Sequence, residues 1–227
     1  MINNNHRPSV FGRRLQKGLQ VTFKLFTRIL VMAVVLGCIV IGSFMVKGYR
    51  LYQEAVNEEG LEARIEAIEE KESYVALNDI SSEFIGQLIE SEDKHFYQHG
   101  GIDMGSTLRA VVTDIKAGAF VQGGSTITQQ LAKNLCFSSE KKIERKIAEL
   151  FVVYKLEKEY SKDKLLELYC NIIYFGENCY GVQDAAANYY GVNASELSKT
   201  QASCLVFTIK CPNYYNPNVY MKKKEAA

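Results

Sequence analysis

The most informative stretch of the chain reads Gly123-Gly124-Ser125-Thr126-Ile127-Thr128-Gln129-Gln130-Leu131-Ala132-Lys133-Asn134. Two glycines lead into a run of hydroxyl and amide side chains, and a lysine follows with no acidic residue near it. Only Ile127, Leu131 and Ala132 suit a buried helix face. Glycines let a backbone approach a ligand closely, and the free N–H groups at a helix start favour an anion. The pattern indicates either an anion-binding helix start or an ordinary capped helix.

The N-terminal part of the chain predicts a membrane anchor. The formal net charge of the 227 residues is +1, yet residues 1–46 hold six basic residues and no acidic one. Residues 29–46 carry no charge, and about 17–25 apolar residues suffice for a transmembrane helix. A cleaved signal peptide is the competing interpretation, but its apolar region is shorter and ends at small residues. The basic flank places residues 1–28 in the cytoplasm and the rest of the chain outside it.

The segment after the anchor is acidic. Eight glutamates lie between Glu54 and Glu72, so we expect residues 47–73 to form a solvated helical stalk. We expect a single domain over residues 74–217 and a tail over 218–227. The cysteines of this part form no C-x-x-C pair, which argues against a zinc or thioredoxin-type site. A Cys170–Cys179 disulfide and unpaired buried cysteines both stay open.

The domain itself reads as mainly α. The whole chain has three prolines, Pro8, Pro212 and Pro217. None of them lies inside a predicted helix, so none interrupts one. Asn193 stands three residues before Glu196, which resembles a capping box. The expected helices cover residues 81–93, 104–119, 125–136, 141–160, 162–173, 181–190 and 194–210.

Two glutamates occupy unusual positions in these helices. Glu92 falls on the stripe of Ile85 and Leu88, so an inward carboxylate is expected there, with a pKa raised toward neutrality as a general base needs. A helix that ends before Glu92 would instead leave it at a loop edge. Within 141–160, Ile143 and Tyr154 belong to one apolar face. The second stripe consists of Arg145, Glu149, Val152 and Leu156. This double stripe predicts that Arg145 and Glu149 form a pair that faces a cleft.

The neighbouring polar residues narrow the chemistry. His99 precedes two glycines and is expected to stabilise a turn rather than to act in catalysis. A basic set consists of Lys133, Lys141, Arg145 and Lys146. Two carboxylates suit chemistry at a glycosidic centre, and the cations suit a diphosphate. A sugar joined through a diphosphate to a lipid would account for the carboxylates and the cations, and also for the membrane anchor.

Four ordered motifs resemble glycosyltransferase family 51, the peptidoglycan transglycosylase domain of class A penicillin-binding proteins and monofunctional transglycosylases. They cover about Tyr74 to Pro217. They are Glu92-Asp93 with Phe96, His99, Gly101 and Asp103; Gly123 through Asn134; Arg145-Lys146-Ile147-Ala148-Glu149; and Glu167-Leu168-Tyr169-Cys170-Asn171-Ile172-Ile173-Tyr174-Phe175-Gly176. Cys170 stands where the family usually has an aliphatic residue.

The resemblance implies a lysozyme-like α fold with one N-terminal transmembrane helix, which polymerises lipid II into β-1,4 glycan strands and releases undecaprenyl diphosphate. Glu92 would be the general base, and Glu149 would position the leaving diphosphate or a divalent cation, Mg or Mn. No organic cofactor and no nucleic acid is implied. The substrate-binding set would be Lys133, Arg145, Lys141, Ser125, Thr126, Gln129, Gln130 and Asn134.

The resemblance also implies a membrane location and, as candidate partners, other cell-wall synthases beside the growing glycan strand. Residues 104–120 would form a lobe that dips into the membrane, or else a plain amphipathic core helix. Its apolar residues are Leu108, Val111, Val112, Ile115 and Phe120.

The chain departs from the family in its fifth motif, where Gln201 replaces the usual glutamate. Two alternatives to the polymerase stay open, and this departure motivates the first of them. One is a weakened, non-catalytic scaffold that binds lipid II or partner synthases. The other is a lysozyme-like hydrolase, against which the basic set argues, because a neutral glycan needs no diphosphate clamp.

Overall fold

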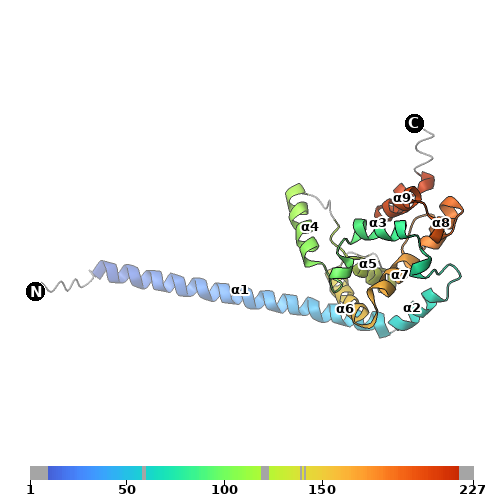
Figure 1. Cartoon of the computed structure of the whole chain (residues 1–227). Helices are drawn as coiled ribbons and strands as arrows, with labels where there is room; N and C mark the ends of the chain where they lie inside the picture. Colours follow the sequence, from blue (N-terminus) through green and yellow to red (C-terminus); the bar gives the residue numbers. More distant parts are fainter. Residues whose placement is uncertain (1–9, 58–59, 119–122, 139, 141, 220–227) are drawn as a thin grey trace, which may run out of the picture. The chain divides into compact units, whose positions relative to one another are not determined.

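The computed structural model describes residues 10–57, 60–118, 123–138, 140 and 142–219 (Figure 1). Contacts divide the chain into two compact units, one up to Lys47 and the other from Gly48 onward. The described residues of the first unit, from Val10 to Lys47, form one helical stretch. Within the described ranges the only β pairing is an isolated antiparallel bridge between Tyr174 and Tyr180. The mainly α class expected from the sequence is therefore confirmed.

The described elements are all helices. In chain order they are α1 (Val10–Asn57), α2 (Leu61–Glu69), η1 (Leu77–Asp79), α3 (Ser82–Glu92), η2 (Phe96–Gln98), α4 (Met104–Ala117), α5 (Ile127–Cys136), α6 (Ile143–Glu159), α7 (Lys162–Ile172), α8 (Val182–Tyr190), η3 (Ala194–Glu196), α9 (Lys199–Lys210) and α10 (Pro212–Tyr215).

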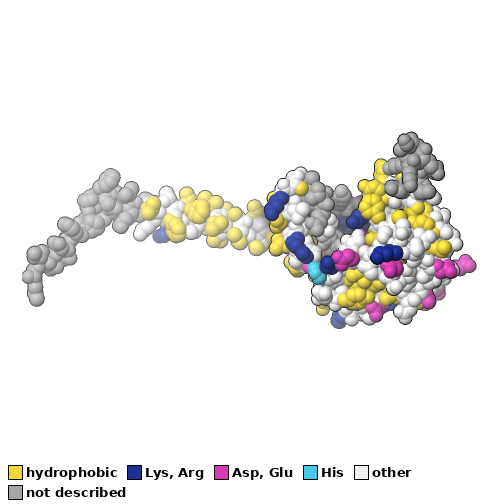
Figure 2. All heavy atoms as spheres, turned by 45° about the horizontal axis from the view of Figure 1, so that its top comes forward, with side chains coloured by type: hydrophobic (Ala, Val, Ile, Leu, Met, Phe, Trp, Pro, Cys, Tyr) yellow, Lys and Arg dark blue, Asp and Glu magenta, His cyan; other side chains and the backbone are white. Residues whose placement is uncertain are grey.

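Helix α1 contains the expected transmembrane segment. Its stretch Thr22–Asn57 is long and apolar enough to cross a membrane, by length and composition. Apolar side chains such as Leu30, Leu36 and Ile39 are exposed on it, and Figure 2 shows hydrophobic side chains along the described part of this helix. Burying such side chains in lipid is favourable by about 25 cal/mol per Å² of apolar surface.

The domain core is built around α5 and α7. Helix α5 packs against both α6 and α7, and α3 packs against α9. The largest fully buried side chains include Tyr169 of α7, Phe84 of α3, Phe96 and Phe175. Each such side chain stabilises the fold by about 1.5–3 kcal/mol relative to exposure. Helices α5, α6 and α7 thus pack into the core that positions the polar residues between them.

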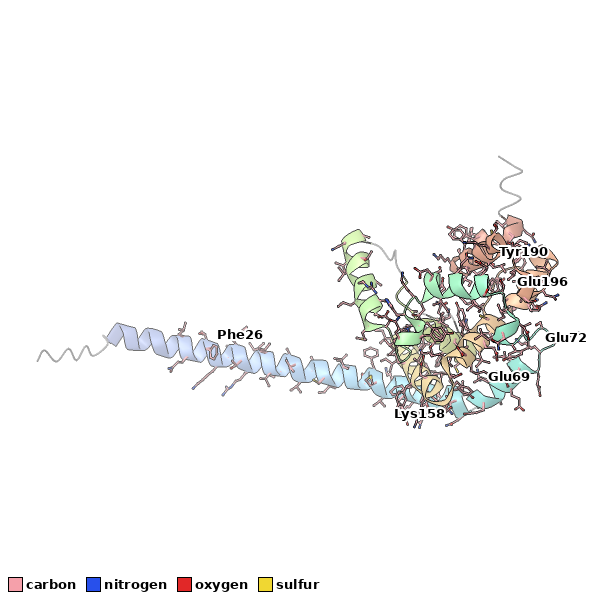
Figure 3. All side chains as sticks on the ribbon, in the orientation of Figure 1. Phe26, Glu69, Glu72, Lys158, Tyr190 and Glu196 are labelled. Atoms are coloured by element: carbon pink, nitrogen blue, oxygen red, sulfur yellow. The ribbon has the colours of Figure 1, made fainter. Side chains whose placement is uncertain are left out.

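The segment expected to be a stalk belongs to the domain instead. Gly48 to Asn57 lies in the same compact unit as the domain, and α2 buries Leu61, Ile65 and Ile68 in the main core. These three residues recur at i, i+4 and i+7, the spacing of one helix face. The glutamates of α2 lie on its other side, and Figure 3 places Glu69 at the edge of the domain.

One helix boundary and one helix face differ from those expected. The helix predicted over 194–210 is broken into η3 and α9, because Ser198 caps α9 in a capping box with Gln201. The Asn193–Glu196 pairing exists, but it closes the turn of η3.

On α6, Ile143 and Tyr154 are exposed, and the core face is the stripe through Val152 and Leu156.

Helix α4 is set apart from the other helices of the domain (Figure 1). Met104, Leu108, Val112 and Ile115 are exposed on it, whereas Ala110 is buried. A plain core helix is thereby excluded for this segment, since its apolar stripe faces outward. Phe120 lies outside the described residues, and the side chain of Val111 is not described.

Candidate functional site

Glu92 is the last residue of α3 and is half-buried. Its Oε2 atom accepts a hydrogen bond from Nε2 of Gln130 at 3.0 Å, and Oε1 accepts one from the Ser91 hydroxyl at 3.3 Å. The helix reaches Glu92, and Leu88, one turn earlier, is fully buried, so the alternative of a helix that ends before Glu92 is wrong. A carboxylate at the edge of the core, with one oxygen held by an amide, is thus available beside α5.

Asp93, the next residue, occupies the start of α5. Its buried carboxylate accepts hydrogen bonds from the Ile127 amide at 3.0 Å and from Nε2 of His99 at 2.8 Å. Thr126 caps the same helix through the amide of Gln129. The expectation of an anionic ligand at this helix N-terminus is therefore wrong, because a protein carboxylate already lies there.

His99 stabilises the turn, as expected. Its Nδ1 accepts a hydrogen bond from the Gly101 amide at 3.1 Å. The proton of the neutral ring must then lie on Nε2, which donates to Asp93. Gly101 has φ +84°, and a Cβ atom there would lie 2.5 Å from Cγ1 of Val153. Only glycine fits this turn without strain.

A small hollow adjoins Glu92. It has a volume of about 180 Å³ and is lined by Glu92, Asp93, Asp103, Ser106 and residues 123–126, among others. Hydrogen bonds from the Ser106 hydroxyl, the Ser106 amide and His95 hold the pKa of Asp103 below its usual range. Figure 2 shows basic, acidic and histidine side chains next to one another on one face of the domain.

The second carboxylate, Glu149, is 1 % exposed on α6. Arg145 donates to its Oε2 from a guanidinium nitrogen at 2.8 Å, and the Lys146 ammonium contacts Oε1. Lys146 also donates to the Ser125 hydroxyl at 3.3 Å. The predicted enclosed Arg/Glu pair is present, and a second cation joins it.

The segment from Ser125 to Gln130 therefore touches both carboxylate centres. Ser125 contacts Lys146, which pairs with Glu149, and Gln130 contacts Glu92. Lys133 lies half-buried in the last turn of the same helix. The structure thus places Ser125, Gln130 and Lys133 of the predicted set along one helix and the loop before it.

Three predicted binding residues, Thr126, Gln129 and Asn134, are placed differently from the expectation. Thr126 and Gln129 are buried and cap α5, with the Thr126 amide donating to Oε1 of Gln129 at 2.9 Å. Asn134 lines another hollow of about 430 Å³, beside Arg64, Lys71 and Tyr174. Lys141 lies outside the described residues. Gln129 therefore shapes the site from within, whereas Thr126 caps the helix and also borders the hollow beside Glu92.

The sequence analysis included Lys146 but not its pairing with Glu149, and it left out Tyr169. Lys146 was assigned to the basic set without a partner, although its i, i+3 spacing to Glu149 is a readable signal. Tyr169 donates to Oε1 of Gln130 at 3.1 Å across 39 residues. No local pattern could reveal that contact.

The expected divalent cation does not fit the residues at Glu149. Both carboxylate oxygens are engaged by cations, which would repel a metal ion. Among the described residues no group of three His, Cys, Asp or Glu side chains is arranged to hold a metal. The five cysteines of the domain are unpaired, and Cys170 and Cys179 are buried.

Comparison with known proteins identifies the family of the chain. A family model described as Transglycosylase matches residues 59–227. The chain is 44% identical over 148 residues to penicillin-binding protein 1A of Aquifex aeolicus, which covers 65% of this chain and 20% of that protein. Penicillin-binding protein 2a of Streptococcus pneumoniae is 45% identical over 148 residues, with the same shares.

A third relative, penicillin-binding protein 1F of Bacillus subtilis, is 42% identical over 156 residues, 69% of this chain and 22% of that protein. The chain thus spans about a fifth of the length of these relatives. The expected mainly α, lysozyme-like transglycosylase fold is confirmed. Because the matched residues include every helix from α2 onward, with both carboxylate centres, the chain belongs to the transglycosylase family.

Proposed function

We propose that the chain is a peptidoglycan glycosyltransferase that polymerises lipid II into β-1,4 glycan strands and releases undecaprenyl diphosphate. The observation that carries this proposal is the segment Ser125–Gln130, which contacts Glu92 at one end and, through Lys146, the Glu149 centre at the other. One centre offers a carboxylate base and the other offers cations. Polymerisation of a diphosphate-linked sugar needs both.

In the proposed reaction, Glu92 accepts the proton of the acceptor sugar's 4-hydroxyl group. That oxygen attacks C1 of the donor sugar from the face opposite the diphosphate, and a new C–O bond forms. The C1–O bond to the diphosphate breaks, and its electron pair leaves with the diphosphate oxygen. Attack from the opposite face inverts the anomeric centre.

The cations of the second centre stabilise the charge that develops on the leaving diphosphate. Arg145 is planar and forms directional hydrogen bonds to phosphate, whereas Lys146 and Lys133 act as point charges. Glu149 holds Arg145 and Lys146 in place, because a buried carboxylate favours cations beside it. Glu149 is thus proposed to position the cations rather than to bind a metal ion.

We further propose that the chain is anchored in the cell membrane, with residues 1–28 in the cytoplasm and the domain outside. The excess of basic residues before the apolar stretch supports this orientation. The exposed apolar stripe of α4, with Leu108, Val112 and Ile115, suits contact with lipid. A lipid-linked substrate would then reach the site without leaving the bilayer.

The scaffold alternative loses part of its basis. Gln201 was the main departure from the family, yet its Oε1 accepts a hydrogen bond from the Ser198 amide at 2.9 Å. A capping box accepts glutamine or glutamate at this position. The replacement therefore leaves the start of α9 intact.

The test is polymerisation of labelled lipid II by the purified full chain, with the Glu92→Gln variant beside it. Wild type should form glycan polymer, and Glu92→Gln should form none while keeping its thermal unfolding transition. Glu83→Gln, on the exposed side of the same helix, should remain active. Lipid II binding without product by wild type would favour the scaffold, and polymer from Glu92→Gln would remove its assignment as the base.

A further inference from the structure

Gln130 lies between a buried tyrosine and the carboxylate of Glu92. Tyr169 of α7 is fully buried, and its hydroxyl donates to Oε1 of Gln130 at 3.1 Å. Nε2 of Gln130 donates to Oε2 of Glu92 at 3.0 Å. Three side chains from α7, α5 and α3 therefore form one continuous chain of hydrogen bonds.

The direction of this chain is determined by chemistry. An ionised carboxylate only accepts hydrogen bonds, so Gln130 must present its NH₂ group to Glu92. The carbonyl oxygen of Gln130 then faces Tyr169, whose hydroxyl donates to it. A rotated amide would place its oxygen against the carboxylate, and like partial charges would repel.

The tyrosine is suited to act as a permanent donor. Burial raises the pKa of Tyr169 well above its usual value, so the phenol keeps its proton at all pH values relevant to the enzyme. A buried hydroxyl also needs a partner, because leaving it unsatisfied is costly. The Tyr169–Gln130 bond is therefore maintained in the folded protein.

We infer that Tyr169 is a positioning residue for the proposed reaction: through Gln130 it holds Oε2 of Glu92 and leaves Oε1 to accept the substrate proton. This inference rests on the proposed role of Glu92. The contact at Oε1 supports it, since the Ser91 hydroxyl lies at 3.3 Å, a longer distance than is usual between two oxygen atoms. A substrate hydroxyl could displace such a contact easily.

The inference is tested with Tyr169→Phe, which removes one oxygen atom and leaves no large cavity. We expect the maximal rate of lipid II polymerisation by the full chain to fall about fivefold, the rate equivalent of one hydrogen bond, with little change in KM. The acidic limb of the kcat–pH profile should move to higher pH, because the ionised carboxylate loses a firmly held donor.

Tyr189→Phe is the matched control. The Tyr189 hydroxyl donates to the Phe175 carbonyl at 2.9 Å, apart from Glu92, so its removal should leave the pH profile unchanged. Gln130→Ala should shift the acidic limb as well, and Tyr169→Phe should add nothing in that background. If Tyr169→Phe fails to fold, Gln130→Ala alone still tests whether the hydrogen-bond chain holds Glu92, since Gln130 is only half-buried.

An unchanged kcat and pH profile in Tyr169→Phe would overturn the inference, as would an equal effect of Tyr169→Phe with and without Gln130. These outcomes differ from a failure of the proposed function. That failure would appear as no polymer from wild type, or as normal polymer from Glu92→Gln.

Discussion

At the residue scale, the buried charges of the domain are held by several donors each. Glu149 is enclosed by Arg145 and Lys146, and Asp93 by a backbone amide and His99. An unpaired buried carboxylate would cost several kcal/mol, of the order of 3–5 when one partner is removed. The site therefore depends on complete sets of partners rather than on single residues.

Glu167 of α7 shows the same behaviour outside the site. Its carboxylate accepts hydrogen bonds from Lys164 at 2.6 Å, from the Leu77 amide at 2.7 Å and from the Tyr74 hydroxyl. Burial alone would raise the pKa of Glu167, but these three donors outweigh it and lower the pKa. Burial and the carboxylate raise the pKa of Tyr74 to about 12.

This network predicts a pH-dependent contribution to stability. A carboxyl group whose folded pKa is lowered stabilises the fold above its unfolded pKa, about 4.3 for glutamate, and loses that effect as the pH falls through the folded value. Glu167→Gln should reduce the free energy of unfolding at pH 7 by about 1.5–3 kcal/mol, since it weakens bonds to a charged group. Below about pH 4 the difference from wild type should shrink.

Denaturant unfolding of the full chain in detergent, at pH 7 and at lower pH, measures this difference. Glu66→Gln serves as the control, because Glu66 is exposed on α2 and its change should have a small effect at both pH values. A pH profile of Glu167→Gln that runs parallel to wild type would contradict the assigned role.

At the element scale, the end of α1 packs closely against α6. A Cβ atom on Gly48 would lie 2.4 Å from Cγ2 of Ile147 and 3.1 Å from the Glu144 carbonyl. The rings of Tyr49 and Tyr52 lie 5.3 and 5.6 Å from that of Phe151. Gly48 thus allows this close approach to the helix that carries Arg145 and Glu149.

Gly48→Ala should therefore destabilise the protein, although in a helix interior alanine is intrinsically more favourable than glycine by about 1 kcal/mol. Overpacking typically costs about 1–3 kcal/mol, so we expect a lower unfolding midpoint in detergent. Gly42→Ala is the control in the same helix, since nothing lies within 4 Å of its Cβ position. Equal behaviour of the two variants would argue against the packing role of Gly48.

The elements also show why some features were predictable and others were not. The expected helices within the domain rest on local periodicity and caps, and all but the last correspond to single helices. The helical character of α2 was expected, but its packing was not, because its three glutamates equal in number the three residues of its buried face, Leu61, Ile65 and Ile68. The Ser198–Gln201 capping box was readable but overlooked. The hydrogen bond between the Asp93 carboxylate and the Ile127 amide at the start of α5 joins residues 34 positions apart. Local spacing in the sequence cannot reveal such a contact.

At the scale of the whole molecule, the proposed orientation can be tested with the native cysteines. Cys204 is exposed on α9, whereas Cys170 and Cys179 are buried. Burial raises the pKa of Cys136 to about 11, and a thiol reacts with maleimide as its thiolate. In a Cys211→Ser background, Cys204 is therefore the main domain thiol within reach of a membrane-impermeant maleimide.

If the domain lies outside the cytoplasm, this reagent should label the full chain in intact bacterial cells, and Cys204→Ser should remove most of the label. The basic flank of residues 1–28 predicts this result, because positively charged segments are retained on the cytoplasmic side. Cys38 lies within the apolar stretch, where a polar reagent does not enter. Labelling of Cys204 only after the cells are opened would reverse the orientation, and with it the access of the site to an external substrate.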